Sequence, residues 1–177
     1  MTERWRTTVT VTVTVACVLL AGASTARAQS AAMDGLRGEF TAVRTAVMTA
    51  ATKAPENLYG FQPTPDVFTL RKQLLHIADA SYSICSGAQG TPGQRPKVDD
   101  DAELAKPQVI ETLTAAFAFC DSALTKTTDA ALSEMVTPAS GTARPKSYYV
   151  AHLLAHTSLH YGNVVTYLRL NKLSPGQ

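Results

Sequence analysis

Tryptophan and cysteine are scarce in this chain of 177 residues, and its net charge is only +2. The one tryptophan is Trp5, and the three cysteines are Cys17, Cys85 and Cys120. So few cysteines exclude a miniprotein that depends on many disulfides in place of a core. With 45% apolar residues, the chain has enough apolar side chains for one domain with its own hydrophobic core.

The small positive charge is confined to the N-terminal segment. The chain has 16 basic and 14 acidic residues, and residues 1–28 contain three of the basic ones and one of the acidic ones. Subtraction leaves 13 of each in residues 29–177. A neutral domain lacks the strongly basic face that nucleic-acid binding requires, so we expect no nucleic-acid partner.

Residues 1–28 have the order of a secretory signal peptide. Two arginines precede an uncharged apolar run over residues 7–22, and Ala26-Arg27-Ala28 forms a small-x-small cleavage site. A permanent membrane anchor is the alternative, but the run is rich in threonine and falls short of a span of about 20 apolar residues. We expect cleavage after Ala28 and an exported protein, periplasmic or extracellular, with no membrane contact.

Residues 29–177 show no internal repeat and no strand-like alternation, and apolar residues recur instead at helical spacing in four stretches. Segments rich in proline or glycine, residues 55–65 and 87–96, separate the first three. The stripes are Met33, Leu36, Phe40, Val43 and Val47; Leu70, Leu74, Ile77 and Ile84; Ile110, Leu113, Phe117, Cys120 and Leu124; and Tyr149, Leu153, His156, His160, Asn163, Tyr167 and Leu170. Four amphipathic helices bury their stripes best against one another, which predicts an all-α four-helix bundle.

Helix boundaries follow from local signals. Asp66 is the expected N-cap of the second helix, and the fourth helix is expected over residues 146–173. Residues 99–101 are three aspartates, which we interpret as the acidic first turn of the third helix; a metal site is the alternative. A short helical piece is expected around Leu132 and Met135.

Cys85 and Cys120 form either a disulfide or two buried thiols. They can meet only if the second and third helices run roughly parallel. The connection over residues 87–101 would then cross the length of the bundle, and about 15 extended residues span ~45 Å.

The four histidines are the most informative polar residues. His156 and His160 lie one helical turn apart on the predicted core seam, where buried imidazoles are costly unless something satisfies them. A shared divalent cation would do so; ordinary core histidines are the alternative. His76 is the candidate third ligand, although it falls off the apolar stripe of its helix and would reach the ion only in a cleft at the side or mouth of the bundle.

Three segments carry a family resemblance. HTSLHYGNVVTYLRLNKLSP (156–175), LRKQLLHIADA (70–80) and LYGFQPTP (58–65) resemble the motifs of the DinB/YfiT-like superfamily, especially its exported members. The resemblance spans residues 32–175. It implies a four-helix bundle with one metal bound by His76, His156 and His160, whereas His152 lies outside the motif.

The chain departs from the family pattern at three places. Leu159 stands where a glutamate often precedes the second ligand, which removes a candidate general base. Lys172 replaces a usual glycine, and Pro175-Gly176 replaces a Pro-Pro pair.

Three functions remain open at this point. The first is a metal-dependent enzyme with zinc or nickel that acts on a small substrate. The resemblance implies a transferase or isomerase that uses a low-molecular-weight thiol, and a hydrolase is the less specific choice. The second is a non-catalytic metal-binding or stress-associated module of the cell envelope, and the third is a plain structural bundle. Homo-oligomers are left open. Candidate helpers at the site are Asp79, Asn163, Tyr59, Tyr82, Tyr148, Tyr149 and Tyr167.

Overall fold

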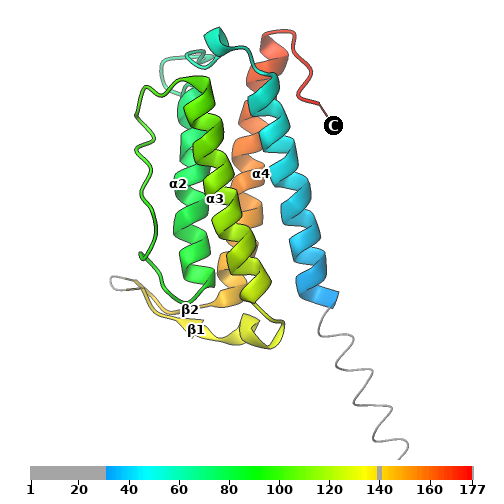
Figure 1. Cartoon of the computed structure of the whole chain (residues 1–177), viewed down its shortest axis with the longest axis vertical. Coiled ribbons are helices and arrows are strands. Elements are labelled where there is room, and N and C mark those ends of the chain that lie inside the picture. The colour runs from blue at the N-terminus through cyan, green and yellow to red at the C-terminus, as the bar shows by residue number, and fades with distance from the viewer. Residues whose placement is uncertain (1–30, 139–140, 177) are drawn as a thin grey trace, which may run out of the picture.

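The computed structural model describes residues 31–138 and 141–176, and its main feature is a bundle of four helices (Figure 1). They are a first helix over residues 31–53, α2 (Leu70–Ala88), α3 (Lys106–Lys126) and α4 (Lys146–Leu170). The predicted all-α four-helix bundle is confirmed. The predicted signal peptide lies outside the described residues. No helix in the described part combines the length and hydrophobicity of a membrane span.

Helices α2 and α3 lie side by side and run parallel to each other (Figure 1). The first helix and α4 run in the opposite direction, so the order along the chain is up, down, down, up. Residues 89–105 cross from one end of the bundle to the other alongside α2, as the parallel arrangement requires. Cys85 and Cys120 form a disulfide with their Cα atoms 5.3 Å apart, which agrees with the condition deduced from the sequence.

Polar contacts fasten this crossing segment, which we call the crossover (residues 89–105), to the side of α2. Asp79 accepts hydrogen bonds from the Arg95 guanidinium at 2.6 Å and from the Val98 amide at 3.0 Å. Further ion pairs join Lys72 to Asp101 and Arg71 to Glu103. The crossover therefore covers a side of α2 that would otherwise face solvent.

The predicted apolar stripes of the first three helices form the core. Met33, Phe40 and Val47 of the first helix are almost fully buried, as are Leu70, Leu74 and Ile77 of α2. Phe117 of α3 packs edge-on against Phe40 with ring centroids 5.9 Å apart. Burial of such side chains is worth about 1.5–3 kcal/mol each, so these stripes explain the bundle.

Several local predictions were wrong. The N-cap of α2 is Thr69, whose side chain accepts from the Lys72 amide, and not Asp66. The three aspartates do not form the first turn of α3, because that helix begins only at Lys106 and they lie in the crossover. The short helical piece expected around Leu132 and Met135 is confirmed only at Leu132, in the 3-10 helix Ala130–Ser133. Met135 instead lies in a two-residue antiparallel pair, β1 (Met135–Val136) with β2 (Arg144–Pro145). Strands this short leave no alternating pattern in the sequence.

The core seam of α4 also differs from the prediction. Its buried residues are Val150, Leu153, Thr157, Val164, Tyr167 and Leu168, whereas Leu170 is 60% exposed. The seam is thus turned by about one residue, which leaves His156 and His160 half-buried beside it. Aliphatic residues lie on two adjacent faces of α4, so spacing alone did not distinguish the buried one. Gly87 allows α4 to pack close to α2, because a Cβ atom at this position would lie only 2.2 Å from the Tyr149 ring.

Candidate metal centre

His76 of α2 and His156 and His160 of α4 come together at the side of the bundle. Each offers a ring nitrogen, and these three atoms all lie within 4.8 Å of one another. The ring centroids are 4.5 Å apart for His156 and His160, 4.6 Å for His76 and His160, and 5.3 Å for His76 and His156. The structure therefore brings together all three predicted ligands.

The position of His76 off the apolar stripe is explained by what surrounds α2. The helix packs against α3 and α4, and the crossover covers part of the remaining side. His76 is consequently only partly exposed, with 29% of its side chain accessible, and does not lie on an open surface. The i, i+4 spacing on α4 then presents His156 and His160 on one face towards it.

An aspartate of the crossover orients the His76 ring. The Asp100 carboxylate lies 3.1 Å from His76 Nδ1, and the Phe68 ring packs edge-on against the same imidazole. With Nδ1–H donating to the carboxylate, Nε2 carries a free lone pair, as in the carboxylate–histidine pairs of many metal sites. Asp100 was not among the predicted site residues, because the triplet that contains it was assigned to the start of α3.

A buried glutamine orients the His160 ring in the same way. His160 Nδ1 lies 2.8 Å from Gln73 Oε1, and Gln73 Nε2 points to the Tyr167 hydroxyl at 3.5 Å. That hydroxyl donates to the Phe68 carbonyl at 2.9 Å, so it accepts from the amide, and the amide oxygen faces the imidazole. Nε2 of His160 is again left free. Sequence reasoning missed Gln73, although a polar residue one turn before His76 was a usable signal.

His156 and His160 are held in the uncharged form that metal binding needs. Burial, followed by repulsion from the rings of His160, His76 and His152, lowers the pKa of His156 to about 4. Burial and then the His76 ring lower the pKa of His160 below its ordinary value. Both rings are neutral at pH 7, so neither must lose a proton before it can bind a cation.

These residues fit a divalent cation bound by three imidazoles. Zinc–nitrogen bonds of about 2.0–2.1 Å in tetrahedral geometry place ligand nitrogens roughly 3.3 Å apart. The three nitrogens, within 4.8 Å of one another, reach that spacing by small side-chain rotations. Imidazole suits zinc and nickel equally, so the donor set does not choose between them.

Most of the other residues predicted to assist at the metal site form contacts away from the triad. Asp79 is tied to Arg95 and Val98; burial opposes its ionisation, but these hydrogen bonds hold its pKa below the usual value. The buried Tyr59 hydroxyl donates to the Ala51 carbonyl, and burial followed by Glu56 raises its pKa to about 12.

Of the remaining tyrosines and Asn163, all but Tyr167 likewise lie outside the hydrogen bonds of the triad. Tyr82 is buried against Phe119, and burial raises its pKa. Tyr149 packs over Gly87, Tyr148 is exposed, and Asn163 is half-buried on α4. Tyr167 alone joins the hydrogen-bond chain that leads to a histidine of the triad.

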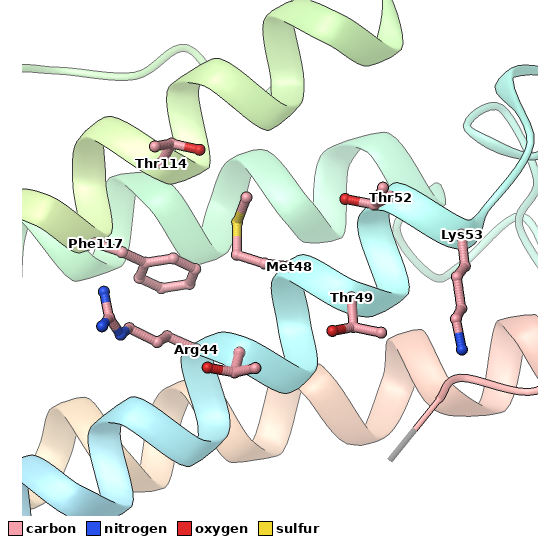
Figure 2. A pocket seen from close by; sticks show the side chains of 8 residues that line it. Arg44, Met48, Thr49, Thr52, Lys53, Thr114 and Phe117 are labelled. Atoms are coloured by element: carbon pink, nitrogen blue, oxygen red, sulfur yellow. The ribbon is translucent and has the colours of Figure 1, made fainter.

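A separate cavity of about 440 Å³ lies between the first helix and α3 (Figure 2). Met48 and Phe117 form its apolar part, and Arg44 and Lys53 lie at its two ends. Its lining contains no histidine, cysteine or carboxylate. The cavity is therefore distinct from the candidate metal centre and lacks groups that bind metal.

Solved structures with this fold include two informative relatives. A DinB-like protein from Bacillus cereus ATCC 10987 matches with a TM-score of 0.69 and 16% identity, over 81% of this chain and 95% of that one. The mycothiol-dependent maleylpyruvate isomerase matches with a TM-score of 0.61 and 15% identity, over 75% of this chain and 60% of the isomerase. At such identities the likeness shows the fold alone.

Comparison of sequences identifies the family. No curated protein matches this chain. The model of the DinB superfamily matches residues 39–164, which include all three histidines of the triad. The chain therefore belongs to the DinB superfamily.

Proposed function

We propose that the protein binds one divalent metal ion, zinc or nickel, through His76, His156 and His160. The observation that carries the proposal is the convergence of three imidazole nitrogens from two helices within 4.8 Å. Two of these rings have their Nδ1 atoms engaged by Asp100 and Gln73, which presents Nε2 to a common point. Three partly buried imidazoles would otherwise gain little from lying so close together.

We further propose a metal-dependent reaction on a small substrate. Three protein ligands leave one coordination position open, and a divalent ion bound there would supply Lewis-acid chemistry. The protein's own residues hold the ligands in place, and the lowered pKa values of His156 and His160 keep these two rings uncharged at pH 7. The fold of the mycothiol-dependent isomerase supports a transferase or isomerase that uses a low-molecular-weight thiol, and hydrolysis is the less specific choice.

Export to the periplasm or the extracellular space is part of the proposal. It is supported by the signal-peptide pattern of residues 1–28 and by the Cys85–Cys120 disulfide, since disulfides persist mainly in oxidising compartments. An exported enzyme would need a thiol present outside the cytoplasm, which favours a substrate-derived thiol or a hydrolytic reaction.

One observation favours the alternative of a non-catalytic metal-binding module. Leu159, which occupies the place of a frequent family glutamate, is 65% exposed on α4. The carboxylate nearest to the triad is Asp100, and it already binds His76 Nδ1. A general base is thus not evident among the described residues. In a non-catalytic module, the metal would instead join α2 to α4.

Elemental analysis of the purified protein tests metal binding directly. We expect close to one equivalent of zinc or nickel in the wild type and almost none in the variant His156→Ala/His160→Ala. His152→Ala is the matched control, because it removes an imidazole from the same helix outside the triad, and it should retain the ion. Absence of metal from the wild type after purification and after incubation with zinc or nickel would reject the proposal.

The open coordination position requires a second measurement. Cobalt(II) substituted into the site should show a visible spectrum that changes when a small thiol such as cysteine is added, because the thiolate enters the fourth position. A spectrum that no added ligand alters would indicate a closed coordination sphere and would favour the non-catalytic module.

A further inference from the structure

A ladder of side chains, each in contact with the next, runs from Arg144 of β2 along one face of α4 to the triad. Its members are spaced four residues apart: Arg144, Tyr148, His152, His156 and His160. Each contacts the next. The Arg144 guanidinium lies 5.0 Å from the Tyr148 ring centre, and the centroids of Tyr148 and His152 are 5.6 Å apart in a stacked arrangement. His152 meets His156 edge-on at 5.6 Å, and His156 lies 4.5 Å from His160.

His152 is the one histidine of this ladder that lies outside the triad and is exposed. In the described part of the chain, neither of its ring nitrogens has a hydrogen-bond partner, so no other group competes for the ring nitrogen that carries a free lone pair. It stands at i, i+4 to His156, the spacing at which two imidazoles on one helix face bind a common ion. His156 is thus shared by two overlapping pairs, an outer one with His152 and an inner one with His160.

We propose that His152 and His156 form an outer cation site that captures a divalent ion from solvent and transfers it to the triad. His152 and His156 would hold the ion first, at the exposed end of the ladder. His156 would remain a ligand while His160 and His76 take the place of His152, so the ion would stay bound throughout. The exchange only replaces ligands and involves no change of oxidation state. This inference rests on the proposed metal binding by the triad.

The geometry gives the two sites different roles. The outer pair has only two protein ligands and no described partner for the His152 ring, so it binds weakly and reversibly. The triad has three ligands, two of them oriented by Asp100 and Gln73, and retains the ion. A transfer site accelerates entry and exit equally and leaves the final affinity unchanged.

The test is the rate of metal loading. Protein stripped with a chelator is mixed with zinc bound to a chromophoric chelator, and transfer is followed by stopped-flow absorbance in wild type and His152→Ala. We expect loading and removal of zinc both to slow about tenfold in the variant, with the dissociation constant changed less than twofold. His152→Asp restores a ligand and should recover most of the rate, and Ser158→Ala, an exposed change elsewhere on α4, should behave as wild type.

Each other outcome overturns the inference in a recognisable way. Equal rates in wild type and His152→Ala would reject the outer site while leaving metal binding by the triad intact. A dissociation constant raised tenfold with an unchanged loading rate would make His152 a permanent ligand and would also reject a transfer role. If neither protein takes up zinc, the proposed function itself fails, and the transfer site fails with it.

Discussion

At the scale of single residues, the hydrogen bonds of Gln73 and Asp100 determine which ring nitrogens of His160 and His76 are left to bind a metal. Neither residue belongs to the triad, yet each fixes one imidazole by its Nδ1 atom, at 2.8 Å for His160 and 3.1 Å for His76. Gln73 is buried and is itself held by Tyr167, whose hydroxyl is anchored to the Phe68 carbonyl. The affinity for a metal should therefore depend on residues that never touch it.

Replacing Asp100 by alanine should weaken metal binding about 10- to 100-fold, the usual effect of losing such an orienting partner. The His76 ring would be free to rotate and to adopt the other tautomer. Competition with a chelator of known affinity measures the change. Asp99→Ala is the matched control from the same segment, and a variant of Asp100 that binds as tightly as wild type would contradict this role.

Acidification should destabilise the metal-free protein in a defined pH window. Because the pKa of His156 in the folded protein is lowered to about 4 from an ordinary 6.5, the unfolded chain binds a proton more readily between these values. The stability conferred by the neutral ring is complete above pH 6.5 and is lost as the pH falls towards 4. Thermal melting of metal-free wild type should show this decrease, and His156→Ala should show a smaller one.

The sequence allowed the three ligands to be proposed but not their surroundings. His156 and His160 were suggested by their spacing, and His76 by the family resemblance against the evidence of its own helix wheel. The wheel misled because it considers one helix at a time, whereas the crossover covers the side of α2 next to His76. Asp100 and Gln73 approach the site through tertiary contacts that are not encoded in local spacing.

At the scale of elements, the parallel pair of α2 and α3 distinguishes this bundle from bundles in which all neighbouring helices are antiparallel. Short connections produce antiparallel neighbours, so this arrangement requires the long crossover of residues 89–105. The crossover is fastened to α2 along its length, and it also delivers Asp100 to His76. The same segment therefore supports both the fold and the site.

Removing the disulfide should lower the free energy of unfolding by about 4 kcal/mol, the chain-entropy value for a closed loop of this size. The two cysteines are separated by 35 residues and both are fully buried. Urea denaturation of Cys85→Ala/Cys120→Ala beside the wild type measures the loss. Mass spectrometry of the unreduced wild type is the companion control, and two free thiols there would contradict the parallel packing in this register.

Helices were predictable as elements because apolar residues repeat every three or four positions over about 20 residues. The stripes beginning at Met33, Leu70 and Ile110 all face the core, completely or in large part. Boundaries failed where competing caps were close together, as with Asp66 and Thr69. The two-residue strands β1 and β2 are too short to leave a periodic signal.

At the scale of the whole molecule, a bound ion would join the two helices that carry the triad. Besides apolar packing, Gln73 of α2 already forms hydrogen bonds with Tyr167 and His160 of α4, and the partly exposed triad lies beside these contacts. An ion that binds only the folded state stabilises it according to its concentration and affinity.

Zinc should consequently raise the melting temperature. At a free concentration 100 times the dissociation constant the gain is about 2.7 kcal/mol. For a domain of this size that corresponds to a shift of roughly 5–10 °C. Differential scanning calorimetry with and without zinc measures it; His156→Ala/His160→Ala should show no shift, and an equal shift in that variant would place the ion elsewhere.

The most direct measurement is anomalous diffraction from a crystal of the purified protein, grown without added metal and recorded across the zinc and nickel absorption edges. We expect one anomalous peak about 2.0–2.1 Å from a ring nitrogen of each of His76, His156 and His160. A peak at residues 99–101, or His76 turned away from the other two rings with no peak between them, would contradict it.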